Sequence, residues 1–198
     1  SHTISGLWIN RPEMPGVGFF GVLDSAVVTN LHIRIDNTNA GVQGNAGVTG
    51  TAGVGINGKV SVGGFAGNAT GADQCRITGC TVSAADSGKT AVASYGQRGS
   101  NYAYAGGFIG SCGEQYRSGA HITGCSAAVN VYGTHHNIGG FAGFVGTDGY
   151  IGTSSATGSV TTGMSQSGGF AGRMGDARSR IENCYSTGAV TELNASGN

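Results

Sequence analysis

The stretch Gly63-Gly64-Phe65-Ala66-Gly67 recurs along this 198-residue chain and decides its fold. Close copies are Gly106-Gly107-Phe108-Ile109-Gly110, Gly139-Gly140-Phe141-Ala142-Gly143 and Gly168-Gly169-Phe170-Ala171-Gly172, and a looser copy is Val17-Gly18-Phe19-Phe20-Gly21. The steps from each shared phenylalanine to the next are 46, 43, 33 and 29 residues. Repetition at such steps indicates a stack of supersecondary units. One large ring between very small residues suits a stack, because backbones approach closely while the ring fills the gap.

A second element follows each copy and aligns with its counterparts. One column of this alignment holds Val28, Ile77, Ile122, Ile151 and Ile181. The column three residues later holds Leu31, Cys80, Cys125, Ser154 and Cys184. Stacked coils produce such columns, since each side chain packs on its counterpart in the neighbouring repeat.

This combination resembles the GLUG repeat of bacterial surface proteins. The four close copies are followed, 10 to 14 residues after the phenylalanine, by I-x-x-C or I-x-x-S, and the last two repeats close with T-G-x-V. The resemblance implies a secreted or cell-surface, adhesin-like protein; the repeat is also found beside the protease part of some immunoglobulin A peptidases. The chain departs from the pattern in long insertions before Phe65 and Phe108, and in Ser154.

The repeats predict an all-β fold, a parallel β-solenoid of about five coils in one domain over residues 1–198. Short strands joined by glycine turns favour it, and an antiparallel sandwich is the alternative that the aligned columns make less suitable. Residues 34–61 and 83–104 are expected to be insertions or loops, and the chain to be a fragment of a longer protein. The predicted core holds Phe19, Phe65, Phe108, Phe141, Phe170, Ile77, Ile122, Ile151 and Ile181.

Composition restricts the class of protein. The chain has 40 glycines without a strict three-residue period, which excludes collagen. Its 10 basic and 10 acidic residues give a net charge of zero, and scattered basic residues do not predict nucleic-acid binding. No apolar run reaches the roughly 18 residues of a membrane-spanning helix. We expect no metal and no cofactor.

Five cysteines raise two questions. Cys80, Cys125 and Cys184 share a column, which predicts a ladder of buried thiols. Cys75 and Cys112 lie in the connecting segments of adjacent repeats and are a candidate disulfide, which depends on a separation that the sequence does not give.

Candidate binding residues lie in the 83–104 segment, because loops on a rigid scaffold often carry function. Aromatic faces and polar tips there suit sugars or protein partners; these residues are Tyr95, Arg98, Asn101, Tyr102 and Tyr104. The alternative is that the tyrosines cover the flank of the stack. The pair His135-His136 precedes a glycine turn, which favours solvated side chains over a metal site.

No catalytic constellation is evident, so we expect a non-enzymatic module with an adhesive or spacing role. Its expected partner is a glycan or protein on a host or neighbouring cell. A different possibility is a glycan-binding or glycan-degrading β-helix, for which Asp148 and Asp176 are the best carboxylate pair. A third is the support region of an extracellular peptidase. A fourth is an ice-binding face, although Gly152 and Glu182 interrupt the threonine column that such a face would need.

Overall fold

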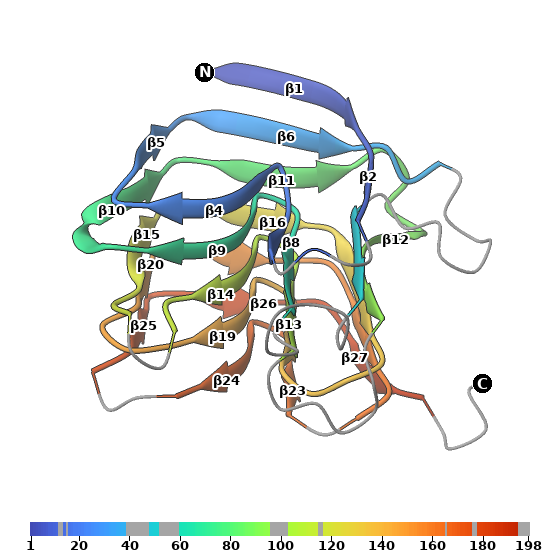
Figure 1. Cartoon of the computed structure of the whole chain (residues 1–198). Helices are drawn as coiled ribbons and strands as arrows, with labels where there is room; N and C mark the ends of the chain where they lie inside the picture. Colours follow the sequence, from blue (N-terminus) through green and yellow to red (C-terminus); the bar gives the residue numbers. More distant parts are fainter. Residues whose placement is uncertain are drawn as a thin grey trace.

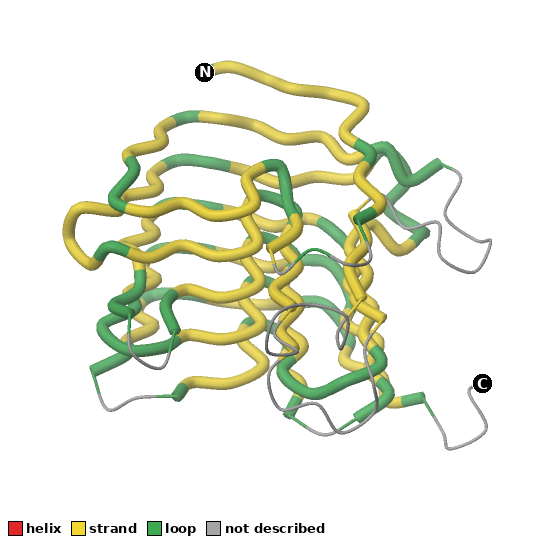
Figure 2. Tube along the Cα trace, viewed as in Figure 1, coloured by secondary structure: helices red, strands yellow, loops and turns green. Residues whose placement is uncertain are grey.

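The chain folds into a stack of parallel coils (Figures 1 and 2). The computed structural model describes residues 1–11, 14, 16–38, 48–51, 60–95, 103–114, 117–164, 166–175 and 178–193. Five sheets, A to E, run along the stack, and each strand pairs with the strand five places later in the chain. Strands β1 to β25 therefore make five coils, and β26 and β27 begin a sixth. The predicted all-β parallel β-solenoid is confirmed, and the antiparallel sandwich is excluded.

Sheets A and B hold six strands each. Sheet A consists of β1 (His2–Leu7), β6 (Leu31–Ile35), β11 (Thr81–Ala84), β16 (Ser126–Ala128), β21 (Ser155–Ala156) and β26 (Tyr185–Ser186). Sheet B consists of β2 (Ile9–Asn10), β7 (Val48–Thr51), β12 (Thr90–Tyr95), β17 (Asn130–Gly133), β22 (Val160–Thr162) and β27 (Val190–Glu192).

Sheets C, D and E hold five strands each. Sheet C consists of β3 (Gly16–Val17), β8 (Val60–Gly63), β13 (Ala103–Gly106), β18 (Ile138–Gly139) and β23 (Ser167–Gly168). Sheet D consists of β4 (Phe20–Asp24), β9 (Ala66–Thr70), β14 (Ile109–Cys112), β19 (Ala142–Val145) and β24 (Ala171–Met174). Sheet E consists of β5 (Val27–Thr29), β10 (Ala72–Thr78), β15 (Ala120–Thr123), β20 (Tyr150–Gly152) and β25 (Arg180–Glu182).

The two segments expected to be insertions or loops contribute strands to the coils. The 34–61 segment contains β7 and the beginning of β8, and the 83–104 segment contains β12. Both β7 and β12 pair within sheet B in the register of their neighbours. The repeat motif does not mark these strands, because its pentapeptide lies at the junction of sheets C and D and not in sheet B.

The phenylalanine of the repeated pentapeptide lies at the corner between sheets C and D and points into the core. Phe65, Phe108 and Phe141 have no exposed surface. Their rings stack along the solenoid with centroid distances of 4.6 Å and 4.8 Å, and Phe170 continues the stack at 4.9 Å from Phe141. This ladder follows from one aromatic residue per coil at one position, since parallel in-register strands are about 4.8 Å apart.

The first coil departs from the ladder. Its register is that of the other coils, with Phe20 opposite Ala66, but the ring that lies against Phe65 is that of Phe20, at 5.4 Å and 60°. Phe19 was the predicted core residue, but it is partly buried and meets Phe20 edge-on at 4.8 Å. Each ring lacks a coil on its outer side, so two half-buried rings cover the end of the ladder.

The isoleucine column of the second element is confirmed. Ile77 pairs with Val28 on one side and with Ile122 on the other. Ile122, Ile151 and Ile181 continue the same column. Ile77, Ile122 and Ile151 are fully buried, whereas Ile181 is partly buried in the last complete coil.

The corner between sheets C and D requires glycine for space. A Cβ atom on Gly106 would lie 2.5 Å from the carbonyl oxygen of Phe141 and 2.8 Å from the Cα of Ala142, and would overlap the carbonyl oxygen of Ile109. All three atoms belong to backbone, which cannot move aside without shifting a strand. The glycines of the repeat are therefore a packing requirement of adjacent coils.

We expect Gly106→Ala to lower the free energy of unfolding by about 1–3 kcal/mol, as other overpacking changes do. Chemical denaturation would measure the loss. Gly163→Ala is the matched control: its nearest heavy atom would be 3.5 Å away, an ordinary contact. We expect that variant to stay within about 0.5 kcal/mol of the parent. Equal stability of the two variants would contradict the close approach of the coils.

Candidate functional site

The structure describes two of the five predicted ligand residues, and both pack on the stack. The Tyr95 ring lies 5.5 Å from the Tyr132 ring of the next coil. The Tyr104 ring stacks on Phe144 at 4.9 Å. These contacts favour the alternative in which tyrosines cover the flank. The remaining predicted residues, Arg98, Asn101 and Tyr102, lie outside the described residues, as does Asp176 of the carboxylate pair.

A different surface gathers polar and aromatic side chains, namely the outer face of sheet E. Strand alternation turns the residue before each buried isoleucine outward. In register, these outward residues are Val27, Arg76, His121, Tyr150 and Arg180. A second outward column holds Thr29, Thr78, Thr123, Gly152 and Glu182. We call this surface, with the D–E turns beside it, the sheet E face.

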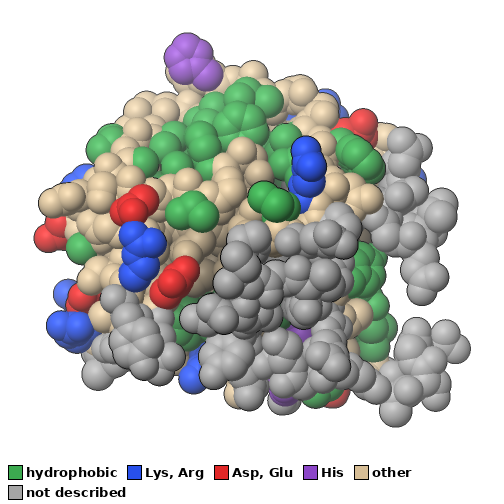
Figure 3. Space-filling view, in the orientation of Figure 1, with side chains coloured by type: hydrophobic (Ala, Val, Ile, Leu, Met, Phe, Trp, Pro, Cys, Tyr) green, Lys and Arg blue, Asp and Glu red, His purple; other side chains and the backbone are tan. Residues whose placement is uncertain are grey.

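Carboxylates hold several of these side chains in place. Asp73 Oδ1 lies 3.0 Å from Nε2 of His121. In the D–E turn of the fourth coil, Asp148 Oδ1 lies 3.0 Å from Nε of Arg178, and its Oδ2 accepts a hydrogen bond from Ser118 Oγ at 2.9 Å. Figure 3 shows charged side chains of both signs gathered at the left of the view, where sheets D and E meet.

The aromatic part of the sheet E face is Tyr150 beside His121. The two rings are 5.3 Å apart and tilted by 48°. The Tyr150 hydroxyl donates to Glu182 Oε2 at 3.3 Å, and Glu182 also pairs with Arg180. Burial and the neighbouring Glu182 carboxylate raise the pKa of the Tyr150 phenol, which keeps it a hydrogen-bond donor at neutral pH.

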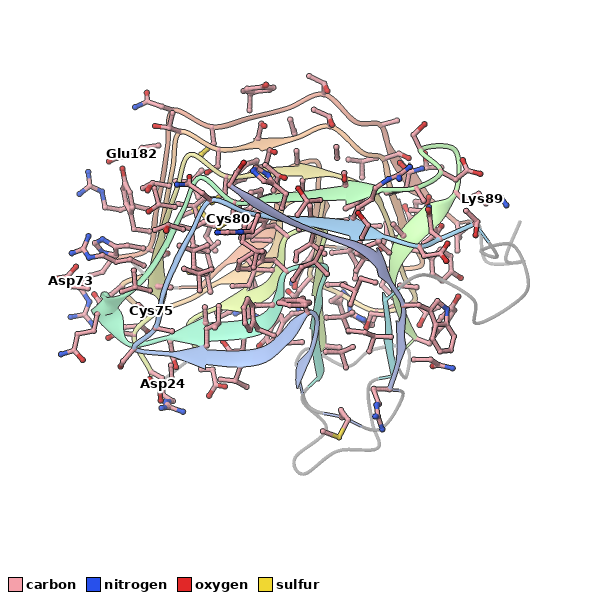
Figure 4. The ribbon with its side chains drawn as sticks, turned by 90° about the horizontal axis from the view of Figure 1, so that it is seen from above. Asp24, Asp73, Cys75, Cys80, Lys89 and Glu182 are labelled. Atoms are coloured by element: carbon pink, nitrogen blue, oxygen red, sulfur yellow. The ribbon has the colours of Figure 1, made fainter. Side chains whose placement is uncertain are left out.

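These side chains line a shallow depression of about 350 Å³. Its lining consists of Ala72, Asp73, His121, Asp148, Tyr150, Arg178 and Arg180. Figure 4 shows Asp73 and Glu182 on one outer side of the stack and Lys89 on the opposite side. The depression offers hydrogen-bond donors, acceptors and a ring in one place. The first outward column could have been predicted from the sequence, because each of its residues directly precedes an aliphatic residue of the aligned column.

The thiol column is buried as predicted for Cys80 and Cys125, and it also forms a hydrogen-bond ladder. The backbone N–H of Cys80 donates to Sγ of Cys125 at 3.4 Å. The N–H of Cys125 donates to Oγ of Ser154 at 3.1 Å, and the N–H of Ser154 to Sγ of Cys184 at 3.4 Å. The Ser154 hydroxyl therefore accepts a backbone hydrogen bond as the cysteine thiols do, which explains why serine can replace cysteine at this position of the column.

We expect Cys125→Ser to cost less than about 1 kcal/mol, because a hydroxyl can replace the thiol as acceptor in this column. Cys125→Ala should cost about 1–3 kcal/mol, because it leaves the buried N–H of Cys80 without an acceptor. Denaturation of both variants under reducing conditions measures the difference. An alanine variant as stable as the serine variant would show that the ladder contributes nothing.

The candidate disulfide between Cys75 and Cys112 is absent, and all five cysteines are free. The Cys75 thiol points at the carbonyl of Leu23, at 4.0 Å, whereas the Cys112 thiol donates to the carbonyl of Ala120 at 3.3 Å. Burial raises the pKa of Cys112 to about 12 and also raises the pKa of Cys75. Both groups therefore stay neutral thiols at neutral pH, and the thiolate is the form that reacts.

His135 is fully buried, which corrects the expectation that the His135-His136 pair is solvated. Its Nδ1 lies 2.6 Å from the carbonyl oxygen of His136, so Nδ1 carries the proton and donates. Nε2 then accepts from the buried Ser94 hydroxyl at 2.6 Å. Burial lowers the pKa of His135 to about 4, so the ring is neutral at physiological pH.

Two parts of the chain match a known repeat family. The family model of the GLUG motif matches residues 58–86 and 165–191. The chain carries the GLUG motif. Both matches run from sheet C through D and E into sheet A, and the second reaches the start of β27 in sheet B. A GLUG motif therefore holds the phenylalanine corner, the isoleucine column and the thiol ladder. The resemblance found in the sequence is confirmed.

The remaining comparisons add no relative. Neither the search of curated proteins nor the search of solved structures returned a match. The described part of the chain contains no helix long and apolar enough to cross a membrane.

Proposed function

We propose that this chain is a non-catalytic GLUG-repeat module of a secreted or cell-surface protein, and that it acts in adhesion by displaying the sheet E face. The GLUG matches support a repeat module, and the aligned outward columns support a display role. The proposed partner is a glycan or protein on a host or neighbouring cell.

The observation that carries the adhesive role is the small advance of the chain per coil. Parallel strands are about 4.8 Å apart, so five coils advance roughly 24 Å along the axis. A single helix of the same length would span roughly 300 Å. Each coil uses 29 to 46 residues, so most of the chain forms the lateral surface of the stack and little of it adds length along the axis. This geometry favours adhesion over a spacing role.

Adhesion is tested with beads coated with the folded chain and applied to immobilised matrix proteins and glycans. Multivalent display raises the apparent affinity of weak single sites, so beads report contacts that the free chain would miss. We expect retention on at least one surface, and loss of retention when the coating is heat-unfolded. The absence of retention on every surface by folded chain would contradict adhesion and favour a spacer.

A further inference from the structure

We propose that the sheet E face binds a neutral glycan chain laid along the axis of the stack. This inference rests on the proposed adhesive function and names the chemical class of the partner. It is carried by three features of the face: an aromatic pair, mutually neutralising charges and the periodic spacing of outward side chains.

The aromatic pair provides an apolar contact in a polar depression. Tyr150 and His121 are half-buried and lie in the same outward column, with ring centroids 5.3 Å apart. The bonded hydroxyl of Tyr150 and the 3.0 Å contact between His121 Nε2 and Asp73 Oδ1 orient both rings. A rigid aromatic side chain presents an apolar face with a polar tip, which matches the apolar C–H face and polar rim of a sugar ring.

The charges of the depression favour a neutral ligand. Its lining carries Asp73 and Asp148 against Arg178 and Arg180, and Arg178 is already paired with Asp148 at 3.0 Å. An anion would meet two carboxylates, and a cation would meet two guanidinium groups. Sugar hydroxyls donate and accept, so they can bridge the exposed edges of these pairs without separating them.

The spacing along the axis favours a chain of sugars over a single ring. Arg76, His121, Tyr150 and Arg180 repeat once per coil, about 4.8 Å apart, a step similar to the length of one hexose unit. The depression of about 350 Å³ lies at the small end of ligand-site volumes and opens on the face. A glycan could therefore place one or two units in the depression and continue along the column.

The test is a binding measurement on an array of immobilised neutral oligosaccharides, with uronic-acid oligosaccharides beside them. We expect retention on neutral glycans, and at least tenfold weaker binding for Tyr150→Ala and for Arg180→Gln. Two matched controls carry the same changes on sheet A: Tyr185→Ala, where the tyrosine is 59% exposed, and Arg34→Gln, where the arginine is also exposed. Both controls should bind as the parent does.

Salt provides a second readout that a purely structural effect would not change. Binding of a neutral glycan should vary less than about twofold between 50 mM and 500 mM salt, because screening acts on charged partners. Preference for uronic-acid glycans with a steep salt dependence would overturn the inference. Equal effects of the sheet E and sheet A variants would also overturn it. Beads retained on matrix proteins but on no glycan would overturn it while leaving adhesion intact.

Discussion

Replacing Phe141 by alanine is expected to lower the free energy of unfolding by about 3–5 kcal/mol, the range measured for fully buried phenylalanines. Phe141 has no exposed surface and lies between the rings of Phe108 and Phe170, at 4.8 Å and 4.9 Å. The strands hold those two neighbours two coil steps apart, about 9.6 Å, so they cannot close the gap. Both ring contacts and the buried area are lost together.

Phe170→Ala is the control for this prediction. Phe170 is partly buried and stacks on one ring, so its truncation should cost about 1.5–3 kcal/mol, less than that of Phe141. Urea denaturation of both variants gives the comparison. If the two substitutions cost the same, or if Phe141→Ala costs less than about 1 kcal/mol, the ladder does not carry the core.

The second large effect is a loss of stability in mild acid caused by His135. Its folded pKa of about 4 lies below the ordinary histidine value of 6.5, so between these values the unfolded chain binds more protons than the folded chain. Stability is therefore complete above pH 6.5 and falls as the pH decreases towards 4. The difference between the folded and unfolded pKa values corresponds to roughly 3 kcal/mol of stability, most of which is lost by pH 4.5.

The measurement compares the free energy of unfolding at pH 7 and pH 4.5 in the parent and in His135→Gln. The variant removes the titrating ring, so its loss between the two pH values should be about 2–3 kcal/mol smaller, although it starts from a lower stability. The carboxylates titrate in both proteins, so their contribution to the loss of stability cancels when the parent and His135→Gln are compared. Equal slopes for the parent and His135→Gln would contradict the burial of a neutral ring.

The sequence predicts this fold well because its main signals are side-chain columns. A phenylalanine and an isoleucine that recur with a fixed relation to each other can stack in one register, and Ile77, Ile122 and Ile151 do so. The first coil was harder to predict, because adjacent Phe19 and Phe20 offer two registers that differ by one residue. The pairing of Phe20 with Ala66 keeps Phe19 in the register that the sequence predicts, yet the ring that lies against Phe65 is that of Phe20.

The candidate site was less predictable, because it depends on contacts between coils. A turn residue such as His135 can point inward or outward, and the inward position depends on Ser94, 41 residues earlier in the chain. The sheet E face likewise depends on two carboxylates that no repeated motif marks, Asp73 at the start of β10 and Asp148 in a D–E turn. The prediction favoured a tyrosine-rich segment instead, because composition alone indicates aromatic residues and not the face on which they gather.

The corner between sheets B and C has a further consequence. In the chain, the strands of sheets B and C that follow one another are separated by four residues in the fourth and fifth coils, but by eight in the second and seven in the third. The second to fifth coils still supply the same five strands and one phenylalanine each to the ladder. The number of residues between sheets B and C can therefore change during evolution without a change in the core. A lineage can gain or lose codons at this corner, and an engineer can graft a foreign peptide there, while the stack beneath keeps its register.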